Sequence, residues 1–264
     1  MFSQCYSFSN SSTAFVIPVL SFGKRYPATN VPTPIVATNR PTPFRVGPNA
    51  VIPRRYKPIP TKKVTVPPLL YSMGSFFEVK GVTYRIEVVL PDAYDVTKKY
   101  PIVYMTDWWF ASKLTKSLLP ILKYNIKPII IVGIQRKSSI TAKDWGINRT
   151  RDYTPTNVPE ADKEQGVPAG TTGGAKHFLS FIKKELIPTI EKKYPSDYEN
   201  RGYVGYSYGG TFGTYALLKK PKLFKKYLLG SPWLKHDDCL LSKELKKMSP
   251  KNLESIKSIF IAVE

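Results

Sequence analysis

The 264-residue sequence is poor in the residues that build metal centres and disulfide frameworks. It contains two cysteines, Cys5 and Cys239, and two histidines, His177 and His236. Two cysteines are too few for a disulfide framework or a cysteine-based metal cluster, and two histidines argue against a histidine-rich metal site. No run approaches the roughly 18 uncharged apolar residues that a membrane-spanning helix requires. We therefore expect no bound metal, no cofactor and no transmembrane segment.

Acidic residues are missing from the first 77 positions, which contain nine lysines or arginines. The whole chain has 40 Lys and Arg against 19 Asp and Glu, a formal net charge of +21. Such a field attracts anionic partners such as RNA or an acidic protein. The alternative is a lysine-rich surface that serves solubility. We favour this alternative, because no helix-turn-helix, zinc-finger or RNP pattern accompanies the charge.

Residues 1–74 form a basic, proline-rich segment. Half of the chain's 24 prolines lie in the first 68 residues. Proline lacks the N–H that helices and central strands use, so we expect an extended, irregular arm. Its opening, MFSQCYSFSNSSTAFVIPVLSFGKR, is serine-rich and acid-free, as organelle transit peptides are. This favours a mitochondrial or plastid location over the cytoplasm, and the alternative is an arm that docks on an anionic partner.

Residues 75–264 have the pattern of an α/β domain. Residues 82–90 alternate apolar and polar side chains, as a half-buried strand does. Short, uninterrupted apolar runs follow, which suit parallel strands buried on both faces; they lie at 101–105, 128–134, 203–206, 227–230 and 259–263. Helical patterns at 177–194 and 210–220 lie between these runs. We therefore predict an α/β fold with a mostly parallel sheet sandwiched by helices.

The stretch GYSYG at 205–209 has the G-x-S-x-G pattern of a nucleophile elbow, between a strand candidate and a helix candidate. The serine must occupy a strained turn in which side chains two residues away would collide, and Gly205 and Gly209 remove that clash. Gly210 lets the helix approach the sheet closely. The alternative is a catalytically silent, glycine-rich turn. The flanking elements favour Ser207 as a nucleophile.

From about residue 75 to its end, the sequence resembles the putative esterase (esterase D-like) family of α/β-hydrolases, which includes the enterochelin esterases. The resemblance rests on YPIVYMTDWWF, IIIVGI, RDYTPT, GGAKHFLSFIKKELIPTIEKKY, GYSYGGTFGTYALLKKPKLFKKYLLGSPWL and SIFIAV, in this order. It implies that Ser207 attacks a carboxylic ester. It also implies that the backbone N–H groups of Tyr208 and Trp109 bind the oxyanion, with Trp108 as the alternative to Trp109.

A serine hydroxyl needs a base to take its proton, and this family places the catalytic histidine after the last strand of the sheet. The sequence ends at Glu264, so the resemblance implies that the C-terminal part of the fold, with that histidine, is missing. His236, beside Asp237 and Asp238, is the remaining candidate for the base. His177 is better explained as an exposed helical residue. Glu264 stands where the family tends to have glycine, which argues against it as the acid of a triad.

The sequence therefore predicts a serine esterase-type hydrolase that acts on small-molecule carboxylic esters through Ser207. The activity of this 264-residue chain is open to question, because the histidine segment is missing. The second hypothesis is a non-catalytic, hydrolase-like subunit of an organellar or ribonucleoprotein assembly, held by its basic arm. The intact elbow favours the first hypothesis. Without the last elements of the fold, we also expect an exposed sheet edge and an exposed apolar face that a partner would cover.

Overall fold

The computed structural model describes residues 15–17, 72–79, 82–92 and 94–262. All of these residues belong to one compact unit of the chain. The remainder of the basic, proline-rich segment lies outside the described residues, and with it the predicted transit peptide and the predicted anionic partner of the arm. Glu264 also lies outside them.

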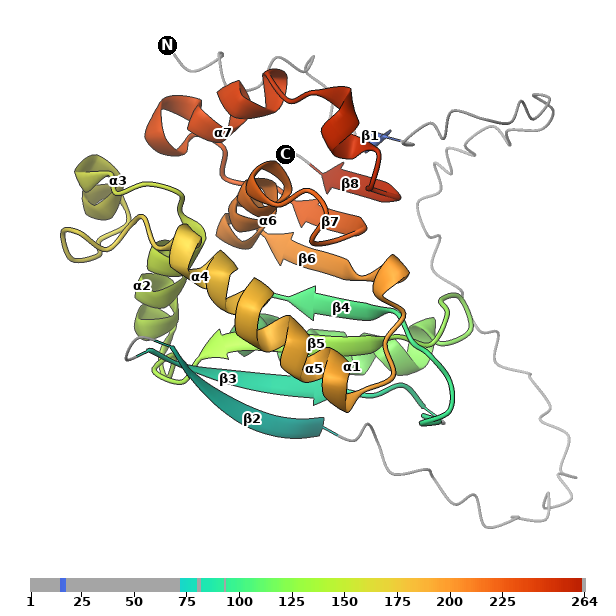
Figure 1. Ribbon diagram of the computed structural model, residues 1–264. Coiled ribbons are helices and arrows are strands. Elements are labelled where there is room, and N and C mark those ends of the chain that lie inside the picture. The colour runs from blue at the N-terminus through green and yellow to red at the C-terminus, as the bar shows by residue number, and fades with distance from the viewer. Residues whose placement is uncertain (1–14, 18–71, 80–81, 93, 263–264) are drawn as a thin grey trace, which may run out of the picture. The chain divides into compact units, whose positions relative to one another are not determined.

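The described residues form an eight-stranded sheet with helices on both faces (Figure 1). The strands are β1 (Phe15–Ile17), β2 (Ser72–Val79), β3 (Val82–Val89), β4 (Ile102–Met105), β5 (Ile130–Arg136), β6 (Gly202–Tyr206), β7 (Lys226–Gly230) and β8 (Ser258–Ala262). Their order across the sheet is β1-β8-β7-β6-β4-β5-β3-β2. The five central strands, from β8 to β5, are parallel, whereas β3 pairs antiparallel with β5 and β2, and β1 pairs antiparallel with β8. The predicted α/β fold with a mostly parallel sheet is confirmed.

Each apolar run that predicted a strand forms one, with ends that differ by one or two residues. The predicted alternation in β3 also holds, since Tyr84, Ile86 and Val88 are buried on one face. Val89 points to the other face and is buried as well, because a helix covers that face at this strand. Burial on both faces is what parallel α/β sheets require.

The structure departs from the expected irregular arm at two places. Phe15–Ile17 form β1, which pairs with β8 so that Phe15 lies opposite Ile261. β2 begins at Ser72, before the predicted domain boundary at residue 75. Both strands lie in segments that contain no proline. The sequence analysis predicted an exposed edge at the last strand. In the structure, β1 pairs with that edge of β8.

Seven α-helices and three short turns connect the described strands. The helices are α1 (Trp108–Leu122), α2 (Ala142–Tyr153), α3 (Pro159–Glu164), α4 (Ala175–Phe181), α5 (Ile187–Lys193), α6 (Tyr208–Lys219) and α7 (His236–Lys246); the turns are η1 (Ile182–Leu186), η2 (Tyr198–Asn200) and η3 (Pro250–Leu253). The single helix predicted at 177–194 is α4, the π-turn η1 and α5 in succession. Pro188 has no N–H to donate, and the wider π-turn just before it makes room for its ring.

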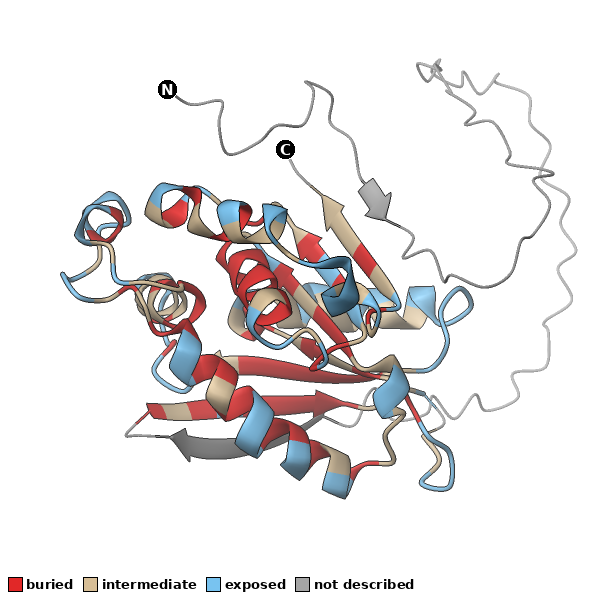
Figure 2. Cartoon of the chain, turned by 45° about the horizontal axis from the view of Figure 1, so that its top comes forward, coloured by how far each residue is buried: buried red, intermediate tan, exposed pale blue. Residues whose placement is uncertain are grey.

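Two apolar clusters lie on opposite faces of the sheet. The larger one packs the strands against α2, α4, α5 and α6, and α6 is buried along almost its whole length (Figure 2). The smaller one consists of Val89, Trp108 and Ile131, under α1. Among the described helices, α1 alone packs on that face, over β5 (Figure 1).

Candidate active site

Ser207 lies in the tight turn between β6 and α6, with φ 54° and ψ −120°. A serine adopts this region rarely, and the strain persists only where surrounding contacts hold the turn. Its N–H donates a hydrogen bond of 2.8 Å to the Gly230 carbonyl, and its own carbonyl accepts one of 2.9 Å from the Thr211 N–H. Ser207 is half-buried and lies at the carboxyl end of β6, where the chain leaves the sheet.

The three glycines predicted around Ser207 lie where side chains would not fit. A Cβ at Gly205 would lie 2.3 Å from the Gly209 carbonyl oxygen. A Cβ at Gly209 would lie 2.6 Å from Thr106 Oγ1, and one at Gly210 would lie 3.0 Å from a Cα of the neighbouring loop. The turn therefore depends on these glycines for its close approach to β4 and to the loop after β7.

The predicted oxyanion donors lie in the first turns of two helices that start beside each other. Tyr208 is the first residue of α6, and Trp108 and Trp109 are the first two of α1. The strands that lead into these helices are parallel neighbours, with Met105 paired to Val204. First-turn N–H groups have no partner within the helix, and both helix dipoles place positive potential there. This arrangement suits a developing negative charge.

A buried ion pair connects the start of α1 to the elbow. Arg149, on α2, donates to both carboxylate oxygens of Asp107, at 2.9 and 3.0 Å. It also donates to the Tyr206 carbonyl at 3.2 Å, immediately before Ser207. Asp107 precedes α1 in the left-handed conformation, with φ 56°, and accepts a further hydrogen bond from Trp145 Nε1 at 3.2 Å. One guanidinium therefore fixes the loop of the candidate oxyanion donors against the end of β6.

Aromatic rings surround this guanidinium. The Arg149 guanidinium carbon lies 4.7 Å from the centre of the Trp145 ring and 5.3 Å from that of Tyr208. Burial by itself would lower the pKa of Arg149, but the charge and hydrogen bonds of Asp107 outweigh it, and the net shift is upward. On the other side, Trp145 stacks with Trp109 and with the exposed Phe110. An aromatic wall therefore borders the start of α1.

His236, the candidate base, lies at the start of α7 and is buried. Its Nε2 lies 3.0 Å from the Thr156 carbonyl oxygen and 3.2 Å from Thr156 Oγ1, while Nδ1 is buried without a hydrogen-bond partner among the described residues. Burial lowers the pKa of His236. Neither His236 nor the exposed His177 makes a hydrogen bond to Ser207 in the described part of the chain. Activation of Ser207 by His236 stays a prediction.

Sequence reasoning identified the elbow but not the pair that holds it. Asp107 follows the predicted strand at 101–105. Its place after a strand end could have indicated a role at the site. Arg149 carried no comparable signal, because it lies 42 residues further on, in a helix that the sequence analysis did not predict. The roles of Ser207, Tyr208 and Trp109 in catalysis stay predictions.

Two classes of feature are missing from the described residues. They contain no group of three His, Cys, Asp or Glu side chains that could hold a metal ion. None of the helices described is long and apolar enough to cross a bilayer.

Comparison with known proteins places this site in a family. A family model described as putative esterase matches residues 79–255. Ferri-bacillibactin esterase BesA of Bacillus subtilis (strain 168) is 31% identical over 191 residues, which cover 65% of this chain and 63% of BesA. Apo-salmochelin esterase of Escherichia coli O6:H1 (strain CFT073) is 31% identical over 179 residues, which cover 66% of this chain and 54% of that protein.

A solved structure agrees with these sequence relatives. The IroE-like serine hydrolase from Shewanella oneidensis superimposes with a TM-score of 0.55 and 29% identity, over 67% of this chain and 57% of that one. The matched residues cover 63% of BesA and 54% of the apo-salmochelin esterase, so the chain spans less than two thirds of the length of these two curated relatives. Because the family model covers more than half of the chain and the strands β3 to β7 and the elbow lie within the matched residues, the protein belongs to the putative esterase family of α/β-hydrolases.

Proposed function

We propose that this protein is a serine ester hydrolase whose nucleophile is Ser207. The observation that carries the proposal is the conformation of Ser207, a non-glycine residue at φ 54° between a parallel strand and a buried helix. Such strain is costly, and it persists at nucleophile elbows because it exposes the hydroxyl beside free helix N–H groups.

The chemistry follows from this geometry. The Ser207 hydroxyl gives its proton to a base and its oxygen attacks the ester carbonyl carbon, which forms a tetrahedral intermediate. The N–H groups of Tyr208 and Trp109 stabilise the oxyanion. Collapse expels the alcohol, which takes up a proton, and leaves an acyl-enzyme. Water then hydrolyses this ester and regenerates the serine.

We propose that the substrates are siderophores, and that the enzyme hydrolyses their ester bonds. BesA and the apo-salmochelin esterase are named for siderophore substrates, and each is 31% identical to this chain. The aromatic wall of Trp109, Phe110 and Trp145 beside the candidate oxyanion donors would offer stacking surfaces to aromatic groups of such a substrate.

A second candidate function is a non-catalytic, hydrolase-like subunit. The observation in its favour is that His236 is hydrogen-bonded to Thr156 rather than to Ser207. A serine without a base is a weak nucleophile. The two functions differ in one measurable property, the reactivity of the Ser207 hydroxyl.

A fluorophosphonate probe tests that property, because it reacts with activated serines and not with ordinary ones. We expect covalent labelling of the purified chain and its loss in Ser207→Ala. Ser249→Ala is the matched control, since Ser249 is exposed and lies between α7 and η3, outside the turn, and it should label like the parent. A folded sample that does not label would contradict the hydrolase proposal and support the non-catalytic one.

The same assay tests the base and the substrate. If His236 is the base, His236→Gln abolishes labelling while His177→Gln preserves it. Equal labelling of both variants would exclude His236. A chain that labels is then given a catecholate trilactone siderophore and p-nitrophenyl acetate. Release of the linear products from the trilactone supports the proposed substrate class, and turnover of the small ester alone contradicts it.

A further inference from the structure

The described helices cover only part of the sheet face that carries α1. Neighbouring strands lie about 4.8 Å apart and a helix is about 10 Å wide, so one helix covers roughly two strands. α1 packs on β5, and no described helix packs on the same face of β6, β7 and β8. Parallel strands are normally buried on both faces. These three strands therefore present an apolar face that the described residues leave open.

Strand register gathers apolar side chains on that face. Val204 pairs with Leu228, and Leu228 pairs with Phe260, so the three side chains form a row across β6, β7 and β8. Leu228 is 48% exposed, whereas its neighbours Tyr227 and Leu229 on the other face are buried. In β8 the described residues are buried only at Ile259, and Phe260 in the row is partly exposed (Figure 2).

The row forms the floor of a groove of about 870 Å³, which we call the sheet groove. Val103 extends its floor toward α1, and Ile126, from the loop after α1, forms its side. In β6, β7 and β8 the groove is lined by residues among the first three of each strand, whereas Ser207 lies beyond the carboxyl end of β6. An occupant of the sheet groove would therefore leave the candidate active site open.

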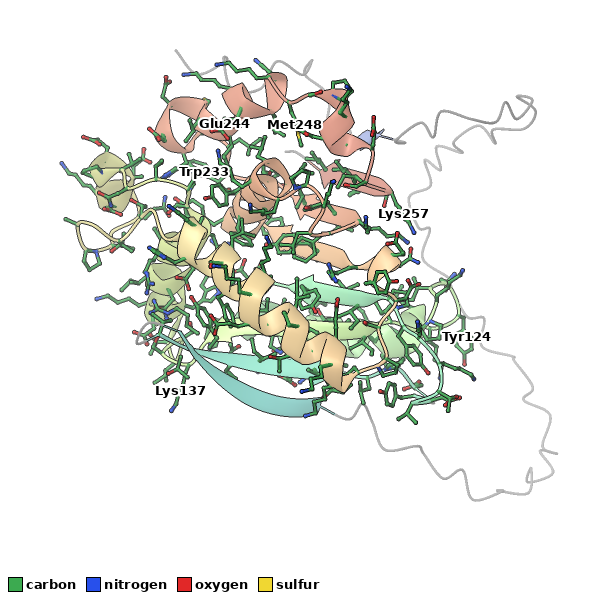
Figure 3. The ribbon with its side chains drawn as sticks, viewed as in Figure 1. Tyr124, Lys137, Trp233, Glu244, Met248 and Lys257 are labelled. Atoms are coloured by element: carbon green, nitrogen blue, oxygen red, sulfur yellow. The ribbon has the colours of Figure 1, made fainter. Side chains whose placement is uncertain are left out.

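Lysines form the rim of the sheet groove. Lys98, Lys99, Lys127 and Lys226 line it, against one acidic residue, Asp197. Of these lysines, only Lys98 has a carboxylate within ion-pair distance in the described part of the chain. Lys257 comes just before β8, at the amino-terminal end of the parallel strands, whereas Trp233 lies at their carboxyl end (Figure 3). The rim is thus positively charged and mostly unpaired, around an apolar floor.

We propose that the sheet groove binds an acidic amphipathic α-helix of a partner protein. The apolar stripe of such a helix would cover Val204, Leu228 and Phe260, as a second helix in the layer of α1 would. Glutamate or aspartate on its flanks would pair with the lysine rim.

Charge decides between this occupant and two others. A second copy of the chain, joined by a two-fold contact, would set each lysine rim near its own equivalent, in a protein of net charge +21. A nucleic acid would match the lysines but would leave Leu228 and Phe260 in contact with its charged backbone. An acidic helix satisfies both the rim and the floor.

The test uses a blocked, fluorescein-labelled peptide of about 16 residues, long enough for roughly four helical turns. Leucines form one face and glutamates both flanks. One control peptide has the same composition with the leucines scattered over all faces, and a second has lysine in place of glutamate. We expect fluorescence anisotropy to show binding of the first peptide only, weaker with rising salt. Equal binding of the scattered peptide would overturn the proposal.

Variants locate the site. Leu228→Asp should weaken binding about tenfold or more, and Ile140→Asp, at a surface position that is 78% exposed, should leave it unchanged. Lys127→Glu with Lys226→Glu tests the rim independently, should Leu228→Asp not fold. Equal affinity of the rim variant and the parent would overturn the proposal. A dimer of the parent in light scattering that Leu228→Asp makes monomeric would also overturn it, in favour of a second copy.

Discussion

Replacing Arg149 by methionine would measure what the buried ion pair contributes to the elbow. The Arg149 and Asp107 side chains are 12% and 9% exposed, so solvent screens them little. The substitution removes two hydrogen bonds to the Asp107 carboxylate and one to the Tyr206 carbonyl. Methionine can still pack against Trp145, but among the described residues the carboxylate keeps only the Trp145 N–H and loses its counter-charge.

Removing one partner of a buried ion pair costs about 3–5 kcal/mol, because the other charge stays buried and unpaired. In a domain of this size 1 kcal/mol corresponds to roughly 2–4 °C in Tm. We therefore expect Arg149→Met to lower the Tm by about 6–20 °C. Lys143→Met, at an exposed site on the same helix, should change stability by no more than about 0.5 kcal/mol.

Thermal and urea unfolding, followed by circular dichroism, would measure both variants. The double variant with Asp107→Asn completes a double-mutant cycle, and asparagine suits the left-handed conformation at that position. Because the double variant buries no unpaired charge, it should recover about 1–3 kcal/mol relative to the sum of the single changes. The reasoning fails if Arg149→Met is no less stable than Lys143→Met, or if the two single effects add.

Two further predictions concern the turn and the buried histidine. Gly205→Ala should destabilise the fold by about 1–3 kcal/mol and abolish Ser207 labelling, since its Cβ would lie 2.3 Å from a carbonyl oxygen; Gly146→Ala, with no atom within 4 Å of the new Cβ, should do neither. The pKa of His236 is lowered by burial, so the unfolded chain binds more protons below about pH 6.5 and stability should fall as the pH drops from there toward the folded pKa. Urea midpoints at pH 7.5 and 5 should show a smaller fall for His236→Gln than for the exposed-site control His177→Gln, and equal falls would contradict the assignment.

The strands and the elbow context were readable from the sequence because their signals are local. Apolar runs of four to seven residues mark buried parallel strands, and a strand-to-helix turn with a serine needs glycines at fixed offsets. Both kinds of signal act within a few residues of the chain. The strand ends differ from the predicted ones by one or two residues, and the predicted single helix contains a π-turn just before Pro188.

The surroundings of Ser207 depend on contacts between distant parts of the chain. Arg149 reaches Asp107 across 42 residues, and His236 reaches Thr156 across 80. Partners of this kind are chosen by how the strands order themselves in the sheet and by which helices lie on each face, and no local periodicity records that choice. The sequence by itself determined an α/β-hydrolase sheet with a serine at its elbow. Only the tertiary structure decided what holds that elbow, where the buried histidine binds and which face of the sheet the described helices leave open, because these depend on packing between residues far apart in the chain.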